Sequence, residues 1–155
     1  MTVVAPGINA KMNELQAAYG LLQLEYVNEY IARRKTIAQT YCEKLNEIPG
    51  IRFLKEMNGV DHSYSYFPVL IDAVKYGCSR NEIYEKLKKN SIFGRRYFYP
   101  LISQFPSYRG LTSARKENLP VATNVAEQVV CLPIYPALEN ENIDRIVEIM
   151  KQGML

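Results

Sequence analysis

The sequence contains no tryptophan, a single histidine and only three cysteines, and the scarcity of cysteine and histidine argues against several classes of site. The cysteines, at positions 42, 78 and 131, are far apart and form no C-x-x-C or Cys/His pair, so neither a disulfide framework nor a zinc site is predicted. His62 has no partners at spacings typical of a catalytic triad, and we interpret it as a loop residue. This use of cysteine favours a reducing, cytoplasmic location.

Long apolar runs and long charged runs are also absent. No run approaches the roughly 20 residues that a membrane helix needs, and residues 1–10 lack the basic segment and apolar core of a signal peptide. The 19 basic and 16 acidic residues are interspersed, which gives a net charge of only +3 and no strongly basic surface. A glycine-rich phosphate loop is missing too. We therefore expect no membrane partner and no nucleic-acid partner.

What the sequence does contain is typical of one folded domain. Apolar residues make up 48% and charged residues 23% of a chain of 155 residues, which is long enough to bury one sizeable core. Twelve tyrosines are present, and several lie between residues 64 and 108. Tyrosine combines a flat apolar ring with a polar tip, so this cluster is a candidate for an interface or a ligand pocket.

The strongest periodic signal lies near the N-terminus. Apolar residues recur at steps of three and four from residue 12 to residue 45, which predicts a helix about 50 Å long that ends before Pro49. A helix of this length exceeds what one small domain covers. We expect part of its apolar stripe to pack against polypeptide outside this sequence.

The remaining elements are shorter and alternate in type. Ser79 and Glu82 form a capping box that begins a helix, Pro68 should restrict its strand to a sheet edge or a bulge, and Asn140 is expected to cap the last helix. The pattern predicts an α+β fold: a small, mostly antiparallel sheet, helices packed on one side, and a long N-terminal helix. The expected strands are residues 51–54, 64–71, 92–99 and 129–132; the expected helices are residues 79–90, 120–128 and 140–152, with a loop at 103–119.

The residues just before the long helix form a candidate anion site. Asn9 stands where its amide can cap the helix, and backbone N–H groups at a helix N-terminus favour an anion. Lys11 carries the wrong charge for this end of the helix dipole, and an anionic ligand such as a phosphate would explain it. The alternative is that Asn9 is only a cap and Lys11 only a solvated charge.

Three segments carry a family resemblance. Residues 7–24, GINAKMNELQAAYGLLQL, resemble the signature of the DegT/DnrJ/EryC1/StrS aminotransferases, with Lys11 replacing the usual arginine. Residues 93–101, FGRRYFYPL, resemble the family's strand that runs to the active site. Residues 119–136 resemble its helix, strand and Leu-Pro motif. The resemblance spans almost the whole chain in the correct order.

The resemblance implies a fold and an activity. This family is similar in fold to type I transaminases that use pyridoxal phosphate, and residues 1–11 then correspond to the lead-in from a large domain and residues 12–155 to the C-terminal small domain. The family moves an amino group from glutamate to a nucleotide-linked keto-sugar, for amino-sugar and cell-surface polysaccharide synthesis, as homodimers. None of the ten lysines has a context resembling the family's Schiff-base lysine, so no catalytic residue is assigned and the isolated chain is expected to be inactive.

The resemblance also assigns cofactor-binding residues. Asn9 matches the asparagine that reaches across the dimer to the cofactor phosphate of the other subunit. Lys11 matches an arginine near the same phosphate, although lysine offers a point charge and not a bidentate fork.

For the substrate, Tyr97 and Tyr99 match aromatic positions near the sugar-nucleotide pocket, and Arg95 or Arg96 is placed near its phosphates. Strand alternation would send Tyr97 and Tyr99 to one face and Arg96 to the other. Ile102 and Ser103 replace a histidine found in many relatives, which resembles a subgroup acting on 4-keto-6-deoxy sugars.

Two other functions are compatible with parts of the sequence. The chain could be a structural or dimerisation domain, since the long helix and the tyrosine-rich surface suit an interface, and self-association is expected. The segment GRRYFY also resembles an aromatic strand on which RNA bases stack. The balanced charge argues against this RNA-binding module.

Overall fold

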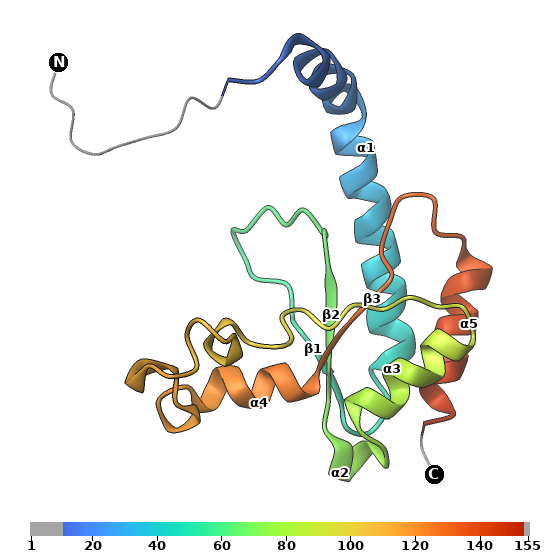
Figure 1. Ribbon diagram of the computed structural model, residues 1–155. Helices are drawn as coiled ribbons and strands as arrows, with labels where there is room; N and C mark the ends of the chain where they lie inside the picture. The colour runs from blue at the N-terminus through green and yellow to red at the C-terminus, as the bar shows by residue number, and fades with distance from the viewer. Residues whose placement is uncertain (1–10, 154–155) are drawn as a thin grey trace, which may run out of the picture.

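The computed structural model describes residues 11–153, which form a three-stranded antiparallel sheet surrounded by helices (Figure 1). The strands run in the order β1-β2-β3, as expected for a small antiparallel sheet. The elements in chain order are α1 (Glu14–Leu45), β1 (Ile51–Phe53), β2 (Phe67–Ile71), α2 (Ala73–Tyr76), α3 (Arg80–Lys89), three short 3-10 turns between residues 102 and 118, α4 (Pro120–Gln128), β3 (Val129–Leu132) and α5 (Asn140–Lys151).

Helix α1 confirms the predicted long helix, and its first turn is capped by its own residues. The Asn13 side chain accepts a hydrogen bond of 2.8 Å from the Gln16 N–H, and Gln16 reaches back to the Asn13 N–H. The cap is therefore Asn13. The capping role predicted for Asn9 falls on a residue outside the described range.

Only the C-terminal half of α1 belongs to the core. Its buried residues are Ile37, Ala38, Tyr41 and Leu45. The first half projects beyond the sheet and leaves large apolar side chains exposed, with Leu15 at 83%. The expected apolar stripe thus has no partner within residues 11–153 over half its length.

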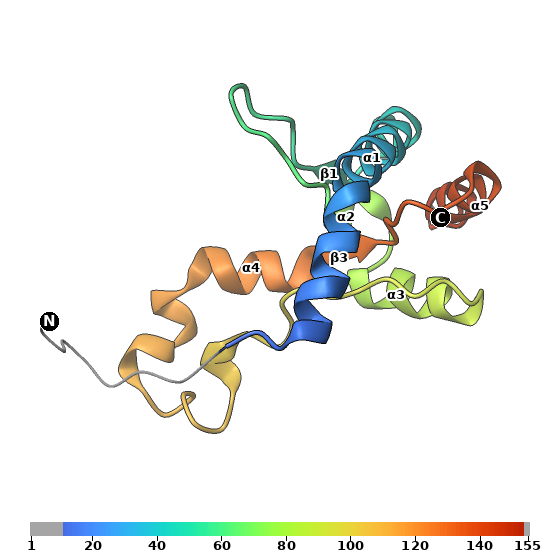
Figure 2. The same ribbon diagram turned by 90° about the horizontal axis from the view of Figure 1, so that it is seen from above.

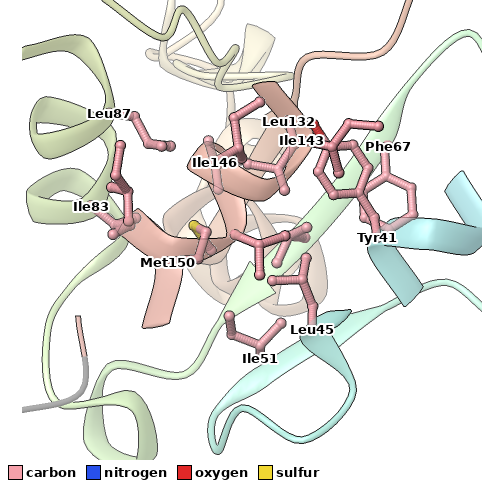
Figure 3. Packing of buried hydrophobic residues seen from close by; sticks show 14 of the residues in the cluster. Tyr41, Leu45, Ile51, Phe67, Ile83, Leu87, Leu132, Ile143, Ile146 and Met150 are labelled. Carbon is pink, nitrogen blue, oxygen red and sulfur yellow. The ribbon is translucent and has the colours of Figure 1, made fainter. Parts of the chain in front are cut away.

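The core lies between one face of the sheet and helices α1, α3 and α5. Alternate residues of β2 point into it, namely Phe67, Val69 and Ile71. Figure 3 shows Ile83 of α3 and Met150 of α5 meeting around the same centre. Burial of an aliphatic side chain stabilises the fold by about 1.5–3 kcal/mol, so this cluster is the main source of stability. The apolar face predicted for the last helix is confirmed: Ile143, Ile146, Val147 and Met150 are buried.

Two details of the sheet and helices differ from expectation. Pro68 lies in the central strand, not in an edge strand. However, β1 ends with Phe53 opposite Val69, so Pro68 pairs with Cys131 of β3 only. The missing N–H of Pro68 is tolerated because no strand lies beside it on the β1 side.

The cap of α5 is Glu139, and the predicted cap Asn140 is the first helical residue.

Helix α4 stands apart from the other helices. Figure 2 shows it on the opposite side of β3 from α5, and none of its residues belongs to the core cluster. The loop of residues 54–66 extends along α1 from the ends of β1 and β2 (Figure 1). Within residues 11–153, no helix combines the length and the apolar content needed to cross a bilayer.

Candidate functional site

The segment of residues 92–99 is not the strand that its composition predicts. It pairs with β3 only at Arg95, whose N–H donates to the Cys131 carbonyl at 3.0 Å and whose carbonyl accepts from the Cys131 N–H at 2.7 Å. Gly94 allows this close approach, because a Cβ there would lie 3.1 Å from the Cys131 oxygen. The chain then turns at residues 97–98, so the strand prediction was wrong beyond one bridge.

Arg96, just before the turn, and Tyr99, just after it, both lie toward helix α3. The Arg96 guanidinium lies 4.5 Å from the centre of the Tyr84 ring and 5.0 Å from the centre of the Tyr99 ring. Both distances are typical of a cation–π contact. Arg96 also donates to the Asn81 side-chain oxygen at 3.3 Å. Arg96 and Tyr99 are thus engaged by groups of this chain.

Arg80 also belongs to this cluster. It was not predicted as a site residue. It is the only buried charged residue in the described range, at 2% exposed. Its Nε donates to the same Asn81 oxygen at 2.9 Å, its Nη1 donates to the Val129 carbonyl at 2.7 Å, and its guanidinium lies 4.9 Å from the centre of the Tyr99 ring. Burial, and next the positive charge of Arg96, lower the pKa of Arg80.

Arg95 and Tyr97 lie apart from this cluster. Arg95 is exposed and donates a hydrogen bond to the Tyr97 hydroxyl, which raises the pKa of Arg95. The Tyr97 ring meets the ring of Tyr66 edge-on, with 5.0 Å between centres. Tyr66, at 50% exposed, was not predicted as a site residue, and no signal beyond its place in the tyrosine-rich region marks it.

The expected grouping of the aromatic side chains was therefore wrong. Alternation along a strand would place Tyr97 and Tyr99 on one face, but Tyr97 contacts Tyr66 while Tyr99 contacts Arg80 and Arg96. Alternation needs extended backbone over several residues, and this segment turns after one bridge. The structure thus divides the four predicted substrate residues into two pairs.

A groove of about 770 Å³ lies between α1 and the loop of residues 54–66. Its wall includes Ala38 and Cys42 of α1, and Tyr64 and Tyr66 of the loop. The Tyr64 hydroxyl donates to a Glu56 side-chain oxygen at 2.6 Å, and this bond is the main cause that raises the pKa of Tyr64 to about 12. Tyr66 lines the groove and its ring also contacts Tyr97, so the pair Arg95–Tyr97 lies next to one wall of the groove.

The residues predicted to bind a cofactor are only partly described. Asn9 lies outside residues 11–153, and Lys11 is exposed just before the Asn13 cap. All ten lysines of the sequence fall in the described range, and none of them is buried. A lysine that reacts as a free amine near neutral pH needs burial or a cationic neighbour to lower its pKa. Within residues 11–153, no group of three His, Cys, Asp or Glu side chains is placed to hold a metal ion.

Comparison with known proteins decides the family. The family model described as the DegT/DnrJ/EryC1/StrS aminotransferase family matches residues 1–151. The chain belongs to this family. The resemblance seen in the sequence motifs is thereby confirmed, and the fold agrees with it.

Several relatives of this DegT/DnrJ/EryC1/StrS chain are named as sugar transaminases. An Escherichia coli protein named dTDP-4-amino-4,6-dideoxy-D-glucose transaminase is 48% identical over 150 residues, which is 97% of this chain and 40% of that protein. A Shigella dysenteriae protein of the same name is 35% identical over 146 residues, covering 94% and 39%. The crystal structure of DesI in the presence of its TDP-sugar product superposes with a TM-score of 0.86 at 31% identity, covering 94% of this chain and 36% of that one. The chain thus spans about 40% of the length of the curated relatives it matches.

Proposed function

We propose that this chain is the C-terminal part of a pyridoxal-phosphate-dependent aminotransferase that moves an amino group from glutamate to a nucleotide-linked keto-sugar. The observation that carries the proposal is the match to the DegT/DnrJ/EryC1/StrS family over residues 1–151, together with relatives named as dTDP-sugar transaminases. The relatives are longer, so the activity belongs to the complete protein and the isolated chain is inactive.

The described residues fit a supporting role toward the cofactor. Asn13 and Gln16 already satisfy each other at the first turn of α1, so the exposed ammonium of Lys11 is available to an anion at that end. An ammonium is an effective phosphate ligand as a point charge. In the proposed enzyme Asn9 and Lys11 hold the cofactor phosphate of a second subunit. The cofactor, when bound, supplies the electron sink for amino transfer, and its Schiff-base lysine comes from outside this chain.

Arg95, Arg96, Tyr97 and Tyr99 form the proposed substrate-binding segment. Arginine suits the diphosphate of a nucleotide-linked sugar because its planar fork can bind two oxygens at once. A tyrosine can pack its ring against a sugar or a base and direct its hydroxyl to a polar group. The exposed guanidinium of Arg95, next to the Tyr97 hydroxyl, offers both kinds of contact at one place.

A hybrid protein tests the proposed function. The matching C-terminal segment of the 48% identical E. coli transaminase is replaced by this chain, and the purified hybrid is assayed with glutamate and a dTDP-linked 4-keto-6-deoxy sugar. We expect the visible absorbance of bound pyridoxal phosphate and formation of an amino-sugar nucleotide. Asn9→Ala in the hybrid should weaken cofactor binding at least tenfold, whereas Asn46→Ala, at the other end of α1, should leave it unchanged.

Two outcomes would contradict the proposal. A folded hybrid that binds the cofactor but aminates no nucleotide-linked keto-sugar would remove the substrate assignment. A folded hybrid without cofactor absorbance, beside an E. coli parent that has it, would remove the cofactor assignment.

The exposed half of α1 supports a second proposal, that the isolated chain self-associates. Large apolar side chains are exposed along this half, including Leu15, Tyr19 and Leu22. A contiguous apolar surface of this kind is normally covered in a soluble protein. Light scattering should give a mass above that of the monomer, and the double variant Leu15→Glu/Leu22→Glu should be monomeric. Val74→Glu, at a highly exposed site on α2, is the control that should keep the association; a monomeric mass of the unsubstituted chain at high concentration would refute the proposal.

A further inference from the structure

The buried guanidinium of Arg80 is anomalous for a charge inside a protein. Buried charges are normally paired with an opposite charge, because removal from water costs several kcal/mol. Within residues 11–153 the only ion pair joins Lys44 and Asp144, so Arg80 has no carboxylate at ion-pair distance, and Glu127 acts on its charge only from farther away. Instead it uses neutral acceptors, the Val129 carbonyl and the Asn81 side-chain oxygen. A buried arginine held by neutral acceptors is suited to a structural task, which is to fix the positions of the groups around it.

That task is visible in what Arg80 joins. Its three contacts lie on three separate pieces of chain: β3 at Val129, helix α3 at Asn81, and the substrate segment at Tyr99. The same Asn81 oxygen also accepts from Arg96, and the same Tyr99 ring also meets Arg96. Arg80 and Arg96 thus share two partners, Asn81 and Tyr99. The half-buried ring of Tyr84, against which the Arg96 guanidinium lies, also belongs to the cluster.

Two of the four residues in the proposed substrate-binding segment, Arg96 and Tyr99, are already held by contacts within this chain. Arg96 already contacts two aromatic rings and an amide oxygen, and Tyr99 already contacts two guanidinium groups. A ligand would have to displace these contacts to use either residue. The side chains of Arg95 and Tyr97 contact each other, the Tyr97 ring also meets the exposed rings of Tyr66 and Phe98, and Tyr66 in turn lines the groove beside α1.

We infer that Arg80 is a positioning residue: through Tyr99 and Asn81 it holds Arg96 against α3, and Arg95 and Tyr97 are thereby left, beside Tyr66, as the ligand-facing part of the segment. The second part of this inference, here called the ligand half, is that Arg95 and Tyr97 face a ligand and that Arg95 binds a nucleoside diphosphate. The ligand half rests on the proposed function. The clamp formed by Arg80, Asn81, Tyr84, Arg96 and Tyr99 stands on the contacts alone.

The clamp is tested on the 155-residue chain by NMR. Side-chain protons of Arg96 that lie against the faces of tyrosine rings are shifted upfield by the ring currents, and this shift is the signature of the clamp. Tyr99→Phe keeps the ring and should keep the shift; Tyr99→Leu removes one of the two rings and should reduce the shift, leaving the part that comes from Tyr84. Because Tyr99 is 45% exposed, both variants should fold.

Arg80 itself is tested by Arg80→Met and Asn81→Ala. Both should reduce the Arg96 shift and move the ring signals of Tyr97, although neither substituted residue touches Tyr97. Ile143→Val, a core change in α5, is the control for simple loss of stability and should leave these signals in place. If Arg80→Met does not fold, Asn81→Ala decides alone, since Asn81 is exposed. Unchanged Arg96 and Tyr97 signals in a folded variant, or equal changes in Ile143→Val, would overturn the inference.

The ligand half has its own measurement on the same chain. Titration with dTDP should shift the signals of Arg95 and Tyr97 and leave those of Arg96 and Tyr99 in place. Larger shifts at Arg96 and Tyr99 would overturn the assignment of the two faces. No shift anywhere up to millimolar dTDP would overturn the ligand half, whereas the proposed function is decided by the hybrid protein and the clamp by the variants above.

Discussion

The hydroxyl of Tyr41 donates a hydrogen bond of 3.0 Å to the carbonyl of Pro133. Tyr41 lies in the buried half of α1, and Pro133 follows the last residue of β3, so the bond ties the long helix to the end of the sheet. The Tyr41 ring also stacks on Phe67 of β2, with 5.0 Å between centres.

Removal of this hydroxyl should destabilise the domain. Tyr41→Phe keeps the ring stacking but removes the bond to the part-buried Pro133 carbonyl, and an intramolecular hydrogen bond contributes about 0.5–1.5 kcal/mol. We expect the free energy of unfolding in urea to fall by that amount. Tyr108→Phe, which changes an exposed tyrosine, should change it by less than about 0.5 kcal/mol. Equal effects of the two substitutions would show that the bond between Tyr41 and Pro133 does not stabilise the domain.

Stability should also fall in alkaline solution. Burial raises the pKa of Tyr41 and of Tyr76 well above the value of about 10 for a tyrosine in an unfolded chain. Above about pH 10 the unfolded chain therefore loses protons that the folded chain keeps, so each pH unit lowers stability by up to about 1.4 kcal/mol per buried tyrosine. Below pH 10 both states keep these protons and the contribution is constant.

Urea unfolding between pH 8 and pH 11 measures this dependence. Tyr41→Phe should reduce the slope above pH 10, because one of the two buried hydroxyls is gone. A free energy of unfolding that is flat up to pH 11 would contradict the assignment.

The hydrogen bond between Tyr64 and Glu56 should set the pKa of the Tyr64 hydroxyl. It is the main cause that raises the pKa of Tyr64 to about 12, because it favours the protonated hydroxyl. Glu56→Ala should move this pKa back toward about 10, as followed by NMR of the labelled ring. Glu47→Ala, at an exposed residue elsewhere, should not. A Tyr64 pKa that stays near 12 without Glu56 would assign the shift to another cause.

Two glycines should respond with opposite signs to the same substitution. Gly50 has a φ of +79°, and a Cβ there would lie 2.5 Å from the backbone N of Tyr76, so Gly50→Ala should destabilise by about 2 kcal/mol or more. Gly20 lies inside α1, and a Cβ there would have no neighbour within 4 Å, so Gly20→Ala should stabilise by about 0.5–1 kcal/mol. Thermal unfolding of both variants checks the signs, and a loss of stability in Gly20→Ala would indicate a neighbour at that site.

Elements with a local cause were predictable from the sequence. The capping box joins Ser79 and Glu82, three positions apart, and the apolar residues of α1 recur at steps of three and four. The proline that begins α4 acts through its own backbone. The short apolar strand before Pro133 was also found where it was expected. These features depend on neighbouring residues, so the sequence alone contains their physical cause.

The candidate site was only half predictable. Its segment was recognised by a family motif, and four of its side chains were named in advance. Their division into two pairs was missed, because it depends on a single bridge to Cys131 and on partners 15 or more residues away, such as Asn81. Tyr66 and Arg80 were missed for the same reason.

The sequence by itself determined the family, the α+β class and the start of most helices, because motifs, caps and apolar spacing act over a few residues. Only the tertiary structure decided that Arg80 is buried, that Pro68 sits in the central strand, and that Tyr97 and Tyr99 have different neighbours. Each of these depends on segments distant in the chain that meet only when the core forms, and no local pattern encodes which side chains will meet there.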